Sequence, residues 1–275
     1  MRHGVPSINA DMGESFGIHS FGNDVALLNI VDAVNVACGM HAGDPSTMHV
    51  TVLQSLEAGV SVGAHPGLPD LVGFGRRSMA VSANELRDLV RYQVGALKGF
   101  IDALGGTLHH IKPHGAMFGM VARDEDLMNA LCDVAVQYEV PIFGLAGTVH
   151  EKIANRRNVP FIAEFYVDME YQDDGMIRLA RHSNRVDQSE VHKRVMSALS
   201  GSTVTGSGKT IPIRVDSFCV HSDLPGSVEV AMQIARAITE SSDASPGTGQ
   251  VTRLSDDGLI TDMGAGRPGN RAESD

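Results

Sequence analysis

Short apolar runs alternate with longer amphipathic stretches along the first 240 residues of this chain. Several runs have the length and continuous apolar character of strands buried on both faces of a sheet. They are residues 6–9, 33–37, 60–63, 108–111, 140–145, 161–165 and 217–220. The intervening segments with apolar residues at the helical period are 24–30, 45–58, 82–104, 124–138, 187–199 and 225–238. This alternation predicts parallel strands joined by crossover helices.

Capping residues mark the boundaries of two predicted helices. Asp44 precedes Pro45, and an acidic N-cap followed by proline at the first helical position is a typical helix start. Ser82 and Glu85 have the spacing of a capping box, and glycine at position 105 marks the end of that segment. These signals support the helical interpretation of both segments.

Polar residues follow the apolar run at most of the predicted strand ends. An open doubly wound sheet and a closed barrel both fit the alternation, but they place reactive groups differently. An open sheet binds its ligand at one switch point with a few loops, whereas a barrel collects residues from all its strand ends at one mouth. We therefore predict an α/β fold with a seven-stranded (β/α) barrel of the TIM-barrel type, formed by residues 1–240 as a single domain.

Residues 241–275 are rich in Gly, Ser and Asp and poor in apolar side chains. Such a segment buries too little apolar surface to offset the entropy lost on ordering it. We predict that it is a flexible or disordered tail.

Charge and composition narrow the possible functions. The chain has 275 residues, 22 basic and 33 acidic side chains, and a formal net charge of −11. This balance argues against a nucleic-acid-binding protein, which presents a basic surface. Apolar runs of about 18 residues are missing, so no membrane span is expected. The segment 1–15 lacks the apolar core of a signal peptide, and three widely spaced cysteines are typical of reduced thiols, so we expect a cytoplasmic protein.

Histidine is frequent, with 12 copies, and four of them lie at predicted strand ends: His41, His65, His114 and His221. Neighbouring glycine or proline lets the backbone turn sharply, so the imidazoles are expected to point into the mouth. Because like charges disfavour each other, they should be largely neutral and usable as bases or metal ligands. Asp11, His65 and His114 are the predicted ligands of a divalent metal that activates water. Alternatively, individual histidines only bond to loop backbone.

Other polar residues near the strand ends allow a functional or a structural role. Asp11 and Glu14 in one tight loop could orient water or bind an amine, although Glu14 could instead cap a helix. Lys112 could hold a carboxylate or phosphate, or be an exposed structural lysine. Arg76 and Arg77 could clamp a carboxylate bidentately or form a solvated pair.

Two further segments have turn composition. Asp174 and Gly175 predict the turn of a hairpin. Residues 206–210, GSGKT, resemble a phosphate loop, but Thr203 stands where the first glycine of GxxxxGK(S/T) should be. We interpret this segment as a plain loop.

Five longer motifs, in collinear order over about residues 7–240, carry a family resemblance. They are NADMGESFG at 9–17, NVACGMHAGDP at 35–45, GAHPGLPDLVGFGRR at 63–77, KPHGA at 112–116 and CVHSDLPG at 219–226. Together they resemble the LamB/YcsF family, which provides the first component of bacterial-type ATP-dependent 5-oxoprolinase. The resemblance implies a seven-stranded barrel related to that of sugar deacetylases and glycoside hydrolases, in agreement with the strand-end argument.

The resemblance also implies an activity, which is hydrolysis of the lactam of 5-oxo-L-proline to L-glutamate coupled to ATP hydrolysis. It implies that the chain is the A component and works with the partner subunits B and C, and it allows a homo-oligomer. The lactam is unstrained and resonance-stabilised, so direct attack by water is slow, and phosphorylation of the amide oxygen would supply a leaving group. ATP is therefore an expected cofactor of the complex, and a divalent metal is allowed.

The expected site residues follow from this hypothesis and from the strand ends. Asp11 with His41, His65 or His114 would activate water, and Lys112, Arg76 or Arg77 would hold the substrate carboxylate or phosphate. The expected catalytic residues are Asp11, Glu14, His41, His65, Lys112, His114 and Glu164. The expected substrate-binding residues are Asn9, Asn35, Asp44, Arg76, Arg77, Asp174, His221 and Asp223.

The chain departs from the family pattern at Met169, where the resemblance implies an arginine. The missing positive charge near the mouth leaves another lactam or cyclic amide open as the substrate. Two other functions also remain open. One is a stand-alone metal-dependent amidohydrolase or deacetylase, and the other is a non-catalytic subunit that presents substrate to its partners.

Overall fold

The computed structural model describes residues 4–178 and 187–244, and within these ranges seven parallel strands close into a barrel. In barrel order the strands are β1 (Ser7–Met12), β2 (Ala33–Ala37), β3 (Ser61–His65), β4 (Leu108–Ile111), β5 (Ile142–Gly144), β6 (Phe161–Tyr166) and β9 (Ser217–His221). Strand β9 pairs with both β6 and β1 and so closes the ring. The seven-stranded (β/α) barrel predicted from the sequence is confirmed.

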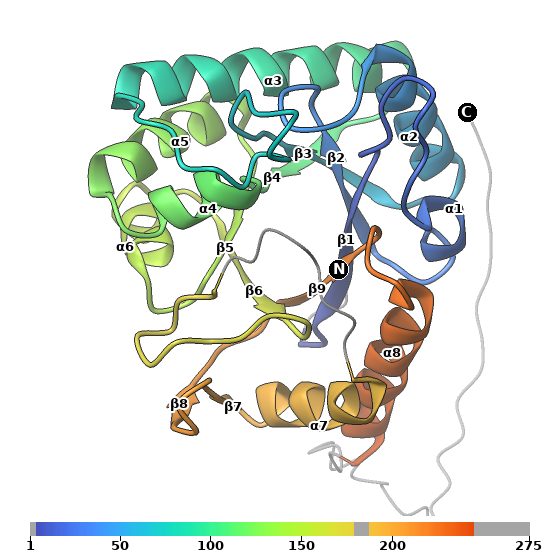
Figure 1. The fold of residues 1–275 in the computed structure, drawn as a ribbon, viewed down its shortest axis with the longest axis vertical. Helices are drawn as coiled ribbons and strands as arrows, with labels where there is room; N and C mark the ends of the chain where they lie inside the picture. The colour runs from blue at the N-terminus through green and yellow to red at the C-terminus, as the bar shows by residue number, and fades with distance from the viewer. Residues whose placement is uncertain (1–3, 179–186, 245–275) are drawn as a thin grey trace, which may run out of the picture. The chain divides into compact units, whose positions relative to one another are not determined.

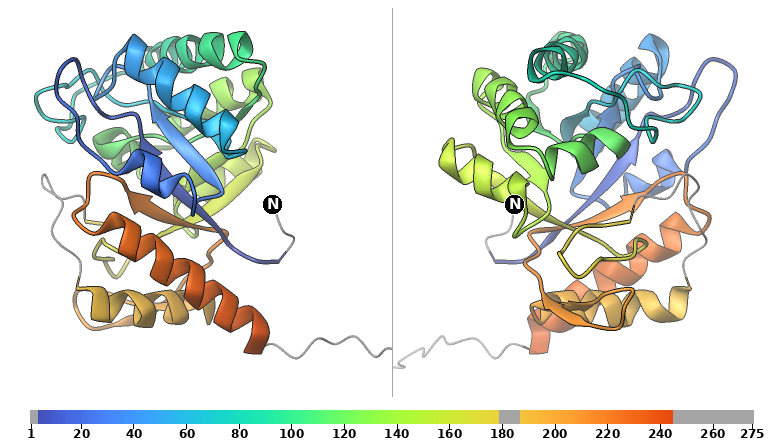
Figure 2. Two further views of the ribbon diagram at one scale, coloured as in Figure 1. Left: turned by 90° about the vertical axis from the view of Figure 1, so that its right-hand side faces the viewer. Right: turned by 60° about the vertical axis from the view of Figure 1, so that its left-hand side comes forward.

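Helices surround the ring of strands (Figure 1). They are α1 (Asp24–Leu27), α2 (Pro45–Glu57), α3 (Ala83–Ala103), α4 (Gly115–Val121), α5 (Glu125–Tyr138), α6 (Val149–Arg156), α7 (Gln188–Leu199) and α8 (Ser227–Ala244). Figure 2 shows α7 beside α8, and these two helices pack against each other. Helices cover the outside of the barrel and side chains fill its interior. Every residue of β1, β2 and β9 is therefore buried.

The capping signals of the sequence form as expected. The carboxylate of Asp44 accepts hydrogen bonds from the backbone N–H groups of Ser46 and Thr47 at 2.8 and 3.0 Å, which fixes the start of α2. Ser82 and Glu85 form the capping box of α3, with the Ser82 N–H donating to Glu85 Oε2 at 2.7 Å.

Several elements differ from the sequence-based expectation. Helix α1 ends at Leu27 rather than at residue 30, and α4 and α6 were not expected. The α4 sequence, GAMFGMV, has two glycines in a short apolar segment, which hides a helical period. Strands β7 (Ser202–Val204) and β8 (Thr210–Pro212) form a separate antiparallel pair. Residues 206–209 of the GSGKT segment lie in the loop between them, as interpreted, whereas Thr210 is the first residue of β8.

The turn at Asp174 forms, with the Gly175 N–H donating to the Gln172 carbonyl at 3.0 Å and a single antiparallel bridge from Tyr171 to Ile177. Helix α8 continues to Ala244, and Ser242 in its last turn donates to the Ile238 carbonyl, so the first residues assigned to the tail are helical. The rest of the predicted tail lies outside the described residues. No described helix is long and apolar enough to cross a membrane.

Candidate active site

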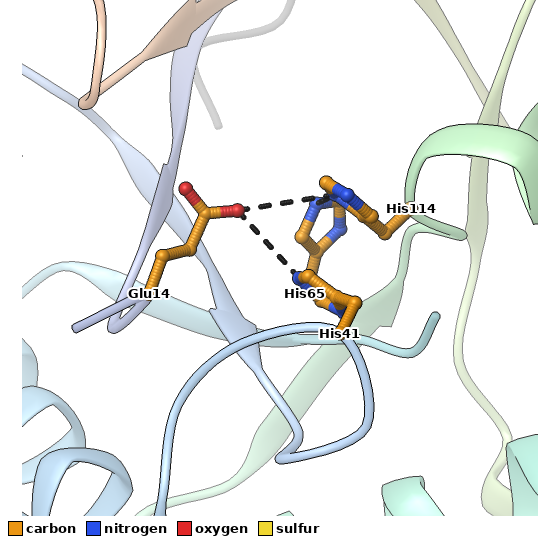
Figure 3. Close-up of side chains that lie close together, drawn as sticks. All are labelled: Glu14, His41, His65 and His114. Atoms are coloured by element: carbon orange, nitrogen blue, oxygen red, sulfur yellow. Dashed lines mark hydrogen bonds and ion pairs between the residues drawn. The ribbon is translucent and has the colours of Figure 1, made fainter. Parts of the chain in front are cut away.

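Side chains from the first four strand ends converge at the mouth of the barrel. Glu14 follows β1, His41 follows β2, His65 is the last residue of β3, and His114 is the N-cap residue of α4. Figure 3 shows the Glu14 carboxylate facing the three imidazoles. All four residues are at most 4% exposed. The predicted convergence of residues distant in sequence therefore occurs.

The three imidazoles contact one another closely. The His41 and His114 rings stack with their centroids 3.7 Å apart and nearly parallel planes. The His65 ring stands edge-on to both of them. Burial lowers the pKa of His41 and of His114 well below the ordinary value, so both are neutral at physiological pH. The expectation that the mouth histidines stay uncharged holds for these two rings and is wrong for His221, because burial is outweighed by the Asp168 carboxylate, which raises the pKa of His221 to about 9.

The side chain of Lys112 is a buried ammonium group between two carboxylates. Its Nζ lies 2.8 Å from Asp11 Oδ1 and 2.7 Å from Glu164 Oε1. It also donates to Cys219 Sγ at 3.1 Å and lies 5.3 Å from the centre of the Tyr166 ring. Burial opposes the charge, but Asp11, with Cys219 and Glu164, outweighs it and raises the pKa of Lys112 well above its usual value. The lysine is therefore charged at neutral pH.

Asp11 connects the lysine to the histidines. Its Oδ1 also accepts a hydrogen bond from the Asn35 amide at 2.7 Å, and its Oδ2 lies 3.2 Å from His65 Nε2. Burial would raise its pKa, but His65 and Lys112 lower the pKa of Asp11 well below the usual range. Asp11 is thus ionised at neutral pH.

Glu14 has the opposite electrostatic character. Its Oε1 lies 3.6 Å from His41 Nε2 and 3.9 Å from His114 Nδ1. Burial, with the negative charges of Asp11 and Asp223, raises the pKa of Glu14 well above its usual value. The mouth therefore holds one strongly acidic and one weakly acidic carboxyl group.

A small cavity lies between these groups. It has a volume of about 20 Å³, and a water molecule needs roughly 10–15 Å³. Its lining residues are Asp11, His65, Arg76, Lys112, Pro113, His114, Gly115, Phe118, Tyr166, Met169, Ile177 and His221. The cavity therefore has room for about one water molecule beside an ionised aspartate and imidazoles.

Most of the residues singled out in the sequence lie in or next to this site. Asn9 and Asn35 are hydrogen-bonded to each other beside Asp11, and the Asn35 amide donates to Asn9 Oδ1 at 2.7 Å. Arg76 lines the cavity, and Asp223 is close enough to affect Glu14. Their expected roles in substrate binding remain predictions.

Three residues expected to bind substrate are occupied elsewhere. Asp44 caps α2 and also accepts the Gly17 N–H at 2.9 Å. Arg77 pairs with Asp70, and its Nε lies 2.9 Å from Asp70 Oδ1. Asp174 accepts the Met176 N–H within its own turn. The structure does not bring these three side chains to the cavity.

Sequence reasoning missed Tyr166, Asp168 and Cys219. Tyr166 donates to Glu164 Oε2 at 2.7 Å, and Asp168 bonds to His221. Alternate residues of a strand face the same side, so Glu164 and Tyr166 share the inner face of β6, and Asp168 continues the same spacing. The same rule places Cys219 beside His221 on β9. The two-residue period of side chains along a strand was the signal that could have identified all three residues.

Two groups of buried residues in the described ranges have donor atoms close enough to hold one metal ion. The first is Glu14, His41, His65 and His114, and the second is Asp11, Cys219 and His221. The predicted ligands Asp11, His65 and His114 are also neighbours, because His65 Nε2 lies 2.9 Å from His114 Nδ1.

Comparison with known proteins gives consistent matches over almost the whole described part of the chain. The model of the LamB/YcsF family matches residues 7–251. The lactam utilization protein lamB of Emericella nidulans is 42% identical over 238 residues, which cover 85% of this chain and 94% of that protein. The A subunit of 5-oxoprolinase from Brevibacillus brevis is 43% identical over 237 residues, or 84% and 93% of the two chains. The crystal structure of a lactam utilization protein from Thermus thermophilus superposes with a TM-score of 0.79 at 35% identity, covering 86% of this chain and 97% of that one.

Proposed function

The chain belongs to the LamB/YcsF family, and on that premise we propose that it is the A component of an ATP-dependent 5-oxoprolinase. In this proposal it hydrolyses the lactam of 5-oxo-L-proline to L-glutamate in complex with the partner subunits B and C. The relatives are named as a lactam utilization protein and as 5-oxoprolinase components of the A type, and these names support the substrate class and the need for partners.

The observation that carries the proposal is the lining of the cavity. Asp11 is ionised there, and the cationic side chains Arg76, Lys112 and His221 surround the same space. A lactam carboxylate and the negative charge that develops on an attacked carbonyl oxygen both need positive charge nearby. The lining therefore suits hydrolysis of an anionic cyclic amide.

Each group has a role in this mechanism. Asp11, beside His65 and His114, orients the attacking water, and the proton that the water loses passes to the lactam nitrogen as the ring C–N bond breaks. Lys112 and the His221 imidazolium stabilise the negative charge on the amide oxygen and on the phosphoryl group that it receives from ATP, while Arg76 binds the substrate carboxylate. The cavity of about 20 Å³ is too small for a five-membered ring, so lining side chains such as Met169 must move to admit the substrate.

ATP finds no suitable site in either of two pockets lined by described residues. The cavity at the mouth is too small, and the larger one, of about 630 Å³, lies over α1 and α2. Among the described residues that line the larger pocket, Asp24 is charged and none is Lys or Arg, although triphosphates are bound by cationic side chains or backbone N–H groups. These two pockets therefore give no support for an ATP site on this chain.

The test is reconstitution of the chain with its partner subunits and measurement of ATP hydrolysis that depends on 5-oxoproline. Asp11→Asn should lower kcat by at least about 100-fold, because it removes the ionised group beside the water. Asp44→Asn is the matched control, since asparagine is an equally good N-cap and Asp44 lies outside the cavity. Wild-type activity of the Asp11 variant would contradict the proposed site.

A stand-alone metal-dependent amidohydrolase is the second candidate, because the mouth contains two groups of potential metal ligands. It predicts hydrolysis of N-acyl or cyclic amide substrates by the isolated chain and loss of that activity on adding a chelator. Hydrolysis only in the mixed complex, together with sensitivity to Asp11→Asn, favours the 5-oxoprolinase proposal. A non-catalytic subunit would instead tolerate substitution of Asp11 in the active complex.

A further inference from the structure

The geometry points to a divalent transition-metal site of the zinc class, with Glu14, His41, His65 and His114 as its four ligands. The donor atoms converge from four different loops and strand ends, and Figure 3 shows the carboxylate opposite the three rings. Imidazole nitrogen with carboxylate oxygen is a typical donor set for Zn²⁺ and related ions. The inference rests on this geometry alone and not on the lactam reaction.

The spacing of the donor atoms is close to that of a tetrahedral site. Ligands about 2.0–2.1 Å from a zinc ion lie about 3.3 Å from one another. Glu14 Oε1 lies 3.6 Å from His41 Nε2 and 3.9 Å from His114 Nδ1. His65 Nε2 lies 2.9 Å from His114 Nδ1. All four donor atoms lie within 4.8 Å of one another, and the stacked His41 and His114 rings must rotate out of their parallel arrangement to direct both nitrogens at one ion.

Hydrogen bonds to the backbone fix which nitrogen of two rings faces the site. His65 Nδ1 lies 2.8 Å from the Lys112 carbonyl, and His114 Nε2 lies 2.8 Å from the Phe74 carbonyl. A carbonyl only accepts, so each of these nitrogens carries the hydrogen. If neither ring carries a second proton, the other nitrogens, His65 Nε2 and His114 Nδ1, present lone pairs to each other. A metal-ligating histidine is oriented in this way, by donating its other N–H to a carbonyl.

Two facing lone pairs 2.9 Å apart repel unless a positive charge lies between or beside them. The cation is either a proton on one ring or a metal ion. A proton serves His65 and His114 but leaves His41 unsatisfied, because both of its ring nitrogens are buried without a hydrogen-bond partner. Buried polar atoms without partners are costly. A metal ion satisfies all three rings and the Glu14 carboxylate together.

The second group of potential ligands does not suit a cation. Lys112 Nζ lies 2.8 Å from Asp11 and 3.1 Å from Cys219, so a positive charge already occupies the space between two of the three ligands. His221 is held by Asp168 through its Nδ1. Asp11 Oδ1 accepts from Lys112 and Asn35, and Asp11 Oδ2 lies 3.2 Å from His65 Nε2. Asp11 is not among the four donor atoms that lie together, so it replaces none of these four ligands, although the sequence analysis expected it to be one.

The experiment is metal titration of the full chain, purified with a chelator and then freed of it. Addition of Co²⁺ should give one equivalent of binding with the intense visible absorption of a tetrahedral site, and Zn²⁺ should displace it. Glu14→Gln and His41→Gln should each weaken Co²⁺ binding by at least about tenfold. His49→Gln, which removes an exposed histidine from α2, should leave binding unchanged. Circular dichroism of the metal-free variants checks their folding, and Glu14→Gln is nearly isosteric if His41→Gln does not fold.

The competing occupant, a proton, has its own signature. Nitrogen NMR of the metal-free chain at neutral pH would then show an imidazolium at His65 or His114, and Co²⁺ would not bind. That pair of results would overturn the site, as would equal Co²⁺ affinity in the wild type and in both cluster variants. Failure of the metal titration leaves the lactam hydrolysis intact, and an inactive reconstituted complex leaves the metal site intact.

Discussion

The carboxylate of Asp168 lies 2.6 Å from Nδ1 of His221, and Nε2 of the same ring lies 3.6 Å from Asp11 Oδ2. Burial alone disfavours an imidazolium, but Asp168, followed by Asp11, outweighs it and raises the pKa of His221 to about 9. His221 therefore stays positively charged at neutral pH, unlike His41 and His114 in the same mouth. Asp168 is a positioning residue, because it sets the charge and direction of a ring that faces the cavity.

Asp168→Asn should lower the pKa of His221 from about 9 to near or below the ordinary 6.5, because burial remains while its nearest counter-charge is lost. The titration is followed by NMR of the His221 ring, with Asp102→Asn as an exposed control. In the reconstituted complex, the alkaline limb of the kcat/KM profile should move to lower pH by the same amount. A His221 ring that still titrates near pH 9 in the variant contradicts this assignment.

The same pair makes stability depend on pH in a predictable direction. The raised pKa of His221 adds stability that is fully present below about 6.5 and is lost as pH rises through about 9. The lowered pKa of Asp168 adds stability that is present above its ordinary value of 3.8 and is lost as pH falls. Urea unfolding should therefore show the largest difference between wild type and Asp168→Asn at about pH 4–6.5. A difference in unfolding free energy between the two proteins that grows toward pH 9 would contradict the assignment.

Lys112→Met should destabilise the chain by about 3–5 kcal/mol, because Asp11 and Glu164 would be left as buried carboxylates without their cation. Lys98→Met removes an exposed pair, 2.7 Å from Asp102 on α3, and should cost at most about 0.5 kcal/mol. Urea unfolding of both variants at neutral pH gives the comparison. Equal losses in the two variants would show that the buried lysine is not compensating these carboxylates.

The barrel could be predicted because each strand end carries local evidence. The apolar runs gave all seven barrel strands, and the polar residues after them favoured a closed ring. The helix α4 and the β7–β8 pair could not be predicted in this way, since short glycine-containing or three-residue segments have no clear period. Their form depends on tertiary packing.

The sequence predicted which residues gather at the mouth but not which of them bond to one another. Glycine or proline within two residues of His41, His65 and His114 marked them as residues of the mouth. Which partner each ring bonds to depends on backbone carbonyls, such as that of Phe74, that the sequence does not place. Asp44 was expected to bind substrate because it belongs to one of the family motifs. The structure instead explains this residue locally, as the cap of α2.

Met169→Arg should strengthen binding of 5-oxoproline, because Met169 lines the cavity at the position where the family pattern implies an arginine. A charge-assisted hydrogen bond to the substrate carboxylate contributes about 1.5–3 kcal/mol, so KM should fall by about tenfold or more. Steady-state kinetics of the reconstituted complex measures this, with Met232→Arg on the exposed side of α8 as the control. An unchanged KM would favour another cyclic amide as the natural substrate.

Gly75→Ala should disturb the histidine cluster, since Gly75 has a φ of +62° and a Cβ there would lie 2.7 Å from His41 Cβ and 2.8 Å from His114 Cδ2. Gly105 has a similar φ of +74° but open space around its Cβ position. Both alanine variants should lose about 1 kcal/mol from backbone strain. Only Gly75→Ala should also lower the activity of the reconstituted complex, because only there must His41 and His114 move. Urea unfolding and kcat of the two variants separate strain from displacement, and equal kcat in both would mean that the position of these rings does not limit the reaction.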